Sequence, residues 1–135
     1  MQRRLLVVTV LACLGACGGS STSSGSGGSP TTPTTTLPPA GGPTITINAS
    51  GVVEPKQLEI QVGSRVIFTN DDRVPHEMSS DPHPSHETCP PINEVSALAP
   101  GQSRQTGVFT IARSCGFHDH GQSENTSLQG TIVIR

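Results

Sequence analysis

The chain has 135 residues, a formal net charge of −2 at pH 7, three phenylalanines, and neither tryptophan nor tyrosine. This length allows one modest domain. The slightly negative charge provides no basic surface for nucleic acid, and the lack of tryptophan and tyrosine argues against a stacking platform for bases or sugars. We therefore expect no nucleic-acid partner.

Residues 1–16 have the pattern of a secretion signal. Arg3 and Arg4 precede an apolar stretch, residues 5–14, that is too short to span a bilayer. The following Leu14-Gly15-Ala16-Cys17 resembles a bacterial lipobox, which implies cleavage before Cys17 and a lipid anchor on that cysteine. The alternative is a plain secretory signal in which Cys13 and Cys17 are incidental. The resemblance implies a lipid-anchored protein of the cell envelope, facing the periplasm or the exterior.

Residues 17–42 follow the predicted cleavage site and consist mostly of Gly, Ser, Thr and Pro. Such a composition buries too little apolar surface to offset chain entropy, so it predicts a disordered tether. The folded domain is expected to occupy residues 43–135.

From Pro43 the sequence alternates between apolar and polar residues with the period of a β-strand. Strands are predicted at residues 44–48, 57–62, 65–70, 107–111, 115–118 and 131–134. No segment shows a sustained helical period. Short alternating strands separated by proline and glycine turns predict an all-β, Greek-key antiparallel β-sandwich.

A proline-rich segment interrupts this pattern between residues 71 and 91. His76 follows Pro75 and is expected at a strand end or on a loop. The prolines that follow predict a long irregular loop carrying His83, His86 and Cys89.

Several motifs resemble those of cupredoxins, the plastocyanin-like copper proteins. They are Phe68-Thr69-Asn70 followed by Val74-Pro75-His76, the turn Leu98 to Ser103, and the closing segment Gly130 to Ile134. The resemblance covers the domain from about Thr44 to Arg135. It implies a sandwich that binds one copper ion at one end, through a His of the first motif and a Cys-and-His loop near the C-terminus.

The chain departs from the cupredoxin pattern at that second loop. When Phe109-Thr110 is aligned with the family motif, Cys115 falls on a tyrosine position and Asp119 falls on the ligand cysteine. No methionine follows His120, so the axial thioether is also missing.

Two interpretations of Cys115 follow. In the first, His76, Cys115 and His118 form a type 1 copper site, since two histidines and one thiolate are the ligands that such electron-transfer centres require. In the second, Cys115 forms a disulfide with Cys89, as paired cysteines of exported domains commonly do.

If the disulfide forms, copper would bind through nitrogen and oxygen ligands. His76 and His120 are then the main candidates, with Asp119 in the place of the thiolate and His118 as a further option. Strand alternation puts Asp119 on the face of Cys115 and His118 on the opposite face, which favours Asp119. His83 and His86 are expected on a surface loop, with secondary metal capture as the lesser alternative.

The sequence contains no motif of hydrolytic catalysis, so we expect a binding protein and not an enzyme. The expected function is copper binding, for electron transfer or for copper handling, by a monomer that exchanges electrons or copper with a partner protein. The alternative is a metal-free structural or interaction module with a vestigial copper site.

Overall fold

The computed structural model describes residues 41–135. The predicted signal peptide, Cys17 and all but the last two residues of the predicted tether lie outside these residues. Within the described part, no helix has the length and apolar character needed to cross a membrane.

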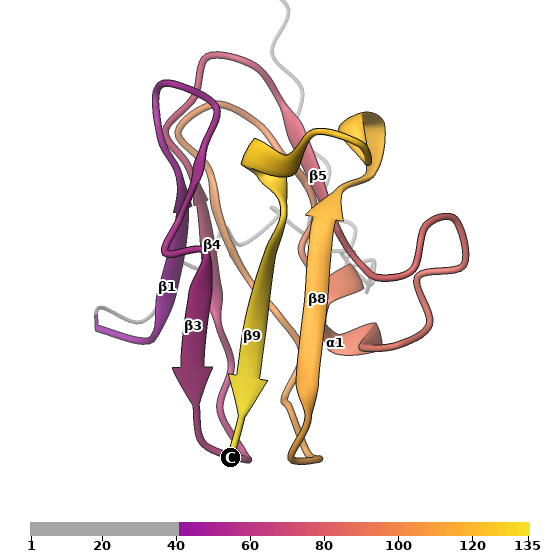
Figure 1. Cartoon of the computed structure of the whole chain (residues 1–135). Coiled ribbons are helices and arrows are strands. Elements are labelled where there is room, and N and C mark those ends of the chain that lie inside the picture. Colours follow the sequence, from indigo (N-terminus) through magenta and orange to yellow (C-terminus); the bar gives the residue numbers. More distant parts are fainter. Residues whose placement is uncertain (1–40) are drawn as a thin grey trace, which may run out of the picture. The chain divides into compact units, whose positions relative to one another are not determined.

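The described residues form two β-sheets that pack face to face (Figure 1). The first sheet has the strand order β2-β1-β4-β7, with β1 at Thr44–Ile47, β2 at Val53–Glu54, β4 at Ile67–Asn70 and β7 at Ser103–Gln105. The second has the order β3-β9-β8-β5-β6, with β3 at Gln57–Ile60, β5 at His76–Ser80, β6 at Ser96–Leu98, β8 at Ser114–Asp119 and β9 at Gly130–Ile134. The predicted β-sandwich is confirmed.

Two strand pairs are parallel, although the sequence predicted an antiparallel sandwich. β1 pairs in parallel with β4, and β3 pairs in parallel with β9. Parallel neighbours need a crossover connection. Between β1 and β4 the crossover runs through β3, which belongs to the other sheet. Because the chain changes sheets in this way, each sheet contains both parallel and antiparallel pairs.

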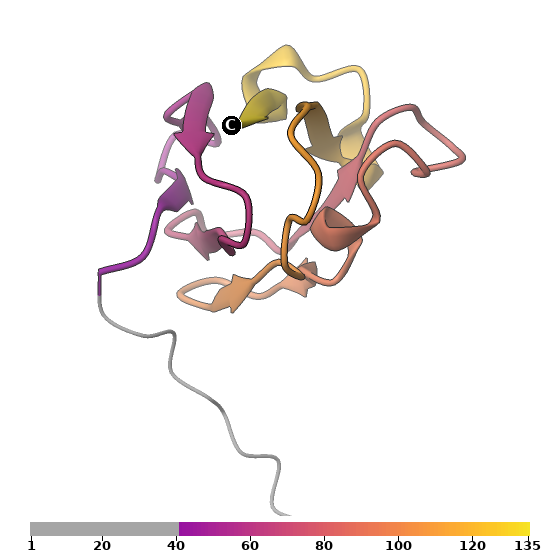
Figure 2. The same ribbon diagram turned by 90° about the horizontal axis from the view of Figure 1, so that it is seen from below.

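Aliphatic side chains and two aromatic rings fill the space between the sheets. Phe68 of β4 and Phe117 of β8 are fully buried, and their rings meet edge to face with centroids 5.2 Å apart. Figure 2 looks along the strands and shows them arranged around this interior. Edge-to-face aromatic pairs contribute about 0.5–1.5 kcal/mol beyond burial, so this pair helps to hold the two sheets together.

The predicted strand at residues 107–111 is wrong, because this stretch has no strand assignment. Phe109 is nevertheless buried, and its backbone exchanges hydrogen bonds with Ser64 and Gly63 at the turn before β4. The alternating pattern therefore marked a buried segment but not a sheet strand. The sequence also gave no signal for the short helix α1, Pro90–Asn93.

After β8 the chain forms two short 3₁₀ helices, η1 at His120–Gln122 and η2 at Thr126–Leu128. The side chain of Lys56 donates hydrogen bonds to the carbonyl oxygens of Thr126, Ser127 and Gln129, at 2.6, 2.8 and 3.1 Å. Lys56 thereby fixes the segment that leads from η2 into β9.

Candidate metal centre

Cys89 and Cys115 form a disulfide. Cys89 stands directly before α1, and Cys115 lies in β8, three residues before His118. Both cysteines are buried. Because Cys115 has no free thiolate in this structure, the type 1 copper arrangement of His76, Cys115 and His118 is not present.

His76 begins β5 and is held by two carboxylates. Its Nδ1 lies 2.6 Å from Oδ2 of Asp119, and its Nε2 lies 3.1 Å from Oδ2 of Asp72. His76 and Asp119 are each 3% exposed. The ring nitrogens of His76 therefore both have partners within this carboxylate–imidazole–carboxylate group.

Hydrogen bonds lower the pKa of Asp72 in this group. The largest cause is the hydrogen bond from the backbone N–H of Arg73, followed by the hydrogen bond with His76. Donated hydrogen bonds favour the ionised form of a carboxyl group. Asp72 is therefore an anion that faces His76 near neutral pH.

His118 lies next to Asp119 in β8, but its side chain faces the opposite side of the strand. Its Nδ1 lies 2.7 Å from Oδ1 of Asp81. An ionised carboxylate has no proton to donate, so Nδ1 of His118 donates this hydrogen bond and Asp81 accepts it. The proton of neutral His118 is therefore on Nδ1, and Nε2 carries a lone pair. His118 is 2% exposed, and its Nε2 is buried without a hydrogen-bond partner among the described residues.

The loop between β5 and α1, residues 81–88, covers this side of β8. Its start is attached to β8 by a hydrogen bond from the backbone N–H of Asp81 to the carbonyl of Gly116, at 3.0 Å. The two ends of the loop meet through a 3.1 Å hydrogen bond from the N–H of Thr88 to the carbonyl of Asp81. Gly116 leaves room for this approach, since a Cβ at that position would meet the Asp81 carboxylate.

His86 is fixed within this loop by its neighbours. Its φ angle is 53°, in the left-handed region that non-glycine residues seldom occupy. The side chains of Ser80 and Asn93 donate hydrogen bonds to its carbonyl oxygen, at 2.8 and 2.7 Å. Its Nδ1 donates to the carbonyl of Ser80 at 2.9 Å, so the lone pair of the neutral ring is on Nε2.

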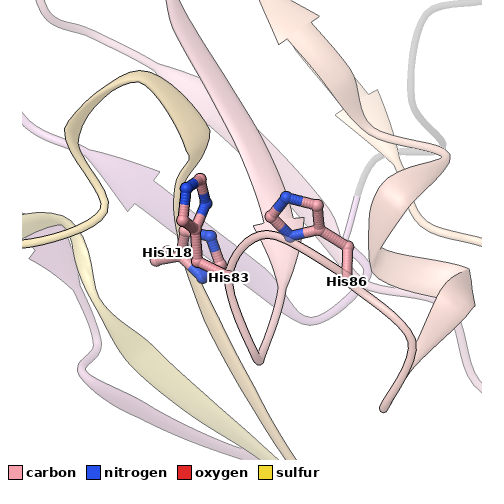
Figure 3. Close-up of side chains that lie close together, drawn as sticks. All are labelled: His83, His86 and His118. Atoms are coloured by element: carbon pink, nitrogen blue, oxygen red, sulfur yellow. The ribbon is translucent and has the colours of Figure 1, made fainter.

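His83, His86 and His118 form one group, which we call the histidine cluster (Figure 3). Each offers a ring nitrogen, and these nitrogens all lie within 4.8 Å of one another. The ring centroids of His86 and His118 are 5.0 Å apart, and that of His83 lies 5.4 and 5.6 Å from them. A copper or zinc ion binds such nitrogens at about 2.0–2.1 Å, so two ligand nitrogens lie at most about 4.2 Å apart, and the three rings would have to move slightly closer together to hold one ion.

His120, the first residue of η1, adjoins the cluster. Its Nδ1 lies 2.9 Å from Nε2 of His86, and its ring centroid is 5.3 Å from that of His83. Because Nε2 of His86 carries the lone pair, Nδ1 of His120 is the donor in this hydrogen bond.

The cluster environment lowers the pKa of His83. Desolvation is the largest cause, followed by the charges of His120, His86 and His118, while Glu124 acts in the opposite direction. A lowered pKa favours the neutral ring, which is the form that binds metal ions.

The structure separates the ligands that the sequence grouped together. His76 and Asp119 are in contact through a hydrogen bond, and the role of Asp119 as a metal ligand stays a prediction. His118 belongs instead to the histidine cluster with His83 and His86, and His120 adjoins that cluster. Binding of one ion by His76 and His120 stays a prediction.

The sequence analysis placed His83 and His86 on a surface loop and did not group them with His118, whereas the structure brings the three rings together. The prolines around them correctly excluded a helix, but a loop folded over a strand brings the two rings together just as well. Two short motifs each contain two histidines: His83-Pro84-Ser85-His86 and His118-Asp119-His120. Each motif lies three residues from a cysteine of the disulfide, and this spacing could have indicated that the histidines come together.

A cavity of about 170 Å³ lies beside the disulfide. Its lining is mainly apolar and includes Pro90, Pro91, Phe109 and Ile111 but no histidine. This cavity therefore does not belong to the histidine cluster.

The two sheets form a cupredoxin fold, as comparison with solved structures shows. A purple cupredoxin from Nitrosopumilus maritimus matches with a TM-score of 0.53 and 22% identity, over 69% of this chain and 99% of that protein. The oxidised plastocyanin of Dryopteris crassirhizoma matches with a TM-score of 0.53 and 17% identity, over 68% and 99%. The Cu(I) form of an amicyanin mutant matches with a TM-score of 0.52 and 21% identity, over 70% and 83%.

No protein-family model matches the chain. No curated protein matches it either. At these identities the structural likeness defines the fold, and the chemistry of the site has to be argued from the chain's own residues.

Proposed function

We propose that the chain binds a single copper ion through the histidine cluster and that it serves copper handling at the cell envelope. The observation that carries the proposal is the buried Nε2 of His118, which has a lone pair, no partner among the described residues, and two further imidazoles nearby. A buried polar atom without a partner is costly. A metal ion would satisfy it.

The surroundings of the cluster fit a metal site. Histidine ligands of metals usually donate their second ring N–H to a carboxylate or a backbone carbonyl, which fixes the tautomer and the ring orientation. Asp81 has this role for His118, and the carbonyl of Ser80 has it for His86. A bound copper ion would supply a Lewis-acidic, one-electron redox centre.

The ligand types favour copper handling over electron transfer. Fast electron-transfer copper sites use a cysteine thiolate with two histidines. Here Cys115 is in the disulfide and Asp119 is bonded to His76. An all-imidazole site is instead suited to holding Cu(II), which a partner protein would deliver or receive.

Cu(II) titration of point variants tests this proposal. All measurements use the full chain with Cys13→Ser and Cys17→Ser, so that neither thiol competes for the metal. We expect one tightly bound Cu(II) per chain, at least tenfold weaker binding in His118→Gln and His83→Ala, and unchanged binding in His76→Gln. His83 is exposed, so its loss of binding cannot be attributed to unfolding.

The opposite pattern would contradict the proposal. If His76→Gln loses the ion and His83→Ala keeps it, the metal site is at His76, as the sequence alone suggested. If the unsubstituted chain binds copper weakly and without fixed stoichiometry, the metal-free structural or interaction module is the better account.

We also propose that a lipid on Cys17 holds the protein at a membrane, as a monomer. The lipobox-like Leu14-Gly15-Ala16-Cys17 supports this. Metabolic labelling with a radioactive fatty acid should mark the wild-type protein in the membrane fraction, and Cys17→Ser should abolish both the label and the membrane association. A labelled Cys17→Ser protein would refute the anchor.

A further inference from the structure

We infer that His120 is a fourth ligand of the histidine cluster, and that the cluster therefore takes a divalent ion of the Cu(II) and Zn(II) class in a set of four imidazoles. This inference rests on the proposed function. It adds His120 to the ligands and specifies the class of metal ion that is bound. It starts from the hydrogen bond between His120 and His86.

The proton positions in the cluster follow from its fixed acceptors. The carbonyl of Ser80 and the carboxylate of Asp81 can only accept, so His86 and His118 both carry their protons on Nδ1. Nε2 of His86 faces His120, and Nε2 of His118 is buried without a partner among the described residues. His120 then donates its own Nδ1 proton to the lone pair of His86, over 2.9 Å.

This hydrogen bond occupies a nitrogen that the metal ion needs. A metal ion on His86 would displace the proton of His120, and Nδ1 of His120 would be left beside the ion. The proton then moves through water from Nδ1 to Nε2 of the same ring, which is exposed. The ring stays neutral, and its Nδ1 gains the lone pair that a ligand requires.

The positions of the four rings support shared ligation. The ring of His120 has its centroid 4.9 Å from that of His86 and 5.3 Å from that of His83. The separation of 2.9 Å between Nδ1 of His120 and Nε2 of His86 is close to the spacing of two ligand nitrogens on one tetrahedral ion, about 3.3 Å for bonds of about 2.0 Å.

Strand alternation explains why His118 and His120 reach the same ion. His118 lies in β8 and His120 two residues later, where β8 ends and η1 begins. Asp119, between them, faces the other way and is tied to His76.

The ligand set defines the ion. Four neutral imidazoles without thiolate or thioether match borderline divalent ions, above all Cu(II) and then Zn(II). Cu(I) prefers the softer sulfur ligands, and the cluster has none. The inferred cargo is therefore the oxidised form of copper.

The decisive variant is His120→Ala, compared with Ser123→Ala at the end of the same 3₁₀ helix. Both are made in the full chain with Cys13→Ser and Cys17→Ser. Competition titrations give the dissociation constants for Cu(II) and Zn(II), and electron paramagnetic resonance reports the ligands of Cu(II). Each titration is repeated with added imidazole.

We expect His120→Ala to weaken binding of both ions by about 10–100-fold, at least as much as loss of an outer-sphere partner does. Its Cu(II) resonance spectrum should change, and imidazole should restore both affinity and spectrum because the vacated position is exposed. Ser123→Ala should behave as the parent chain.

Every other outcome contradicts either the proposed function or the assignment of His120 as a ligand. A parent chain that binds neither ion overturns the proposed function. A parent chain that binds while His120→Ala has the same affinity and spectrum overturns the fourth ligand alone. An equal loss in Ser123→Ala, or no rescue by imidazole, would mean that His120 only supports the local fold, and this also overturns the inference.

Discussion

His118 and Asp119 are adjacent residues whose side chains belong to two different groups. Alternate residues of a strand face opposite sides, so His118 reaches the histidine cluster while Asp119 reaches His76. The sequence allowed this alternation to be predicted. It did not show that the loop at residues 81–88 covers the side of His118, because the contact between Asp81 and Gly116 joins residues far apart in the chain.

Asp81 orients His118, and its removal should weaken metal binding. We expect Asp81→Ala to raise the dissociation constant for Cu(II) by about 10–100-fold, because the His118 ring loses the partner that fixes its tautomer. Asp71→Ala is the matched control, since Asp71 is an exposed carboxylate outside the cluster. Equal affinity in the two variants would show that Asp81 does not orient a ligand.

The lowered pKa of His83 predicts how the metal-free protein responds to acid. An unfolded chain takes up this proton near the ordinary value of 6.5, whereas the folded chain takes it up at a lower pH. Over that window the unfolded state binds more protons, so the free energy of unfolding falls as the pH falls.

Urea unfolding at a series of pH values from 7.5 to 5.5 measures this effect. The metal-free parent chain should lose more stability over the series than His83→Ala does. Identical pH dependence in the two proteins would contradict the lowered pKa.

At the scale of elements, the sequence predicted the strands that alternate cleanly and missed those that do not. β1, β3, β4, β8 and β9 all fall within or close to the predicted ranges. β5, with the sequence His-Glu-Met-Ser-Ser, has too few apolar residues to be recognised. Hydrogen bonds satisfy the buried Ser80, as its contacts with His86 and Asn93 show.

The disulfide attaches the end of the loop at residues 81–88 to the sheet, so its removal should have two effects. We expect Cys89→Ala combined with Cys115→Ala to lower the free energy of unfolding by about 2–4 kcal/mol, because the unfolded chain loses a constraint. Cu(II) affinity should also fall, since His83 and His86 lie on the loop that ends at Cys89.

Chemical denaturation and Cu(II) titration of the same double variant measure the two effects. His76→Gln, which leaves the loop intact, is the control for the affinity. An unchanged dissociation constant in the double variant would show that the hydrogen bonds around Ser80 hold the loop without the disulfide.

At the scale of the whole molecule, the proposed metal binding would be coupled to folding. The cluster joins a loop to β8, so it exists only in the folded chain, and an ion bound there stabilises the fold by mass action. A free ion concentration of 100 times the dissociation constant contributes about 2.7 kcal/mol. We expect Zn(II) to raise the midpoint of thermal unfolding by roughly 10 °C in a domain of this size.

The same thermal scan on His83→Ala separates the cluster from non-specific effects. This variant should show little shift at the same Zn(II) concentration, while the metal-free midpoints of the two proteins stay close. A full shift in His83→Ala would place the stabilising ion elsewhere.

His118 is buried, but His83 and His120 are exposed. An ion bound beside them would therefore change the electrostatic potential of the molecular surface. A divalent ion at the proposed site would add two positive charges to this surface, where Asp81 contacts His118 and Glu124 raises the pKa of His83. Such a field extends about 8 Å at physiological ionic strength. The loaded and empty forms would thus present different electrostatic surfaces, and an acidic partner would distinguish them before any ligand exchange begins.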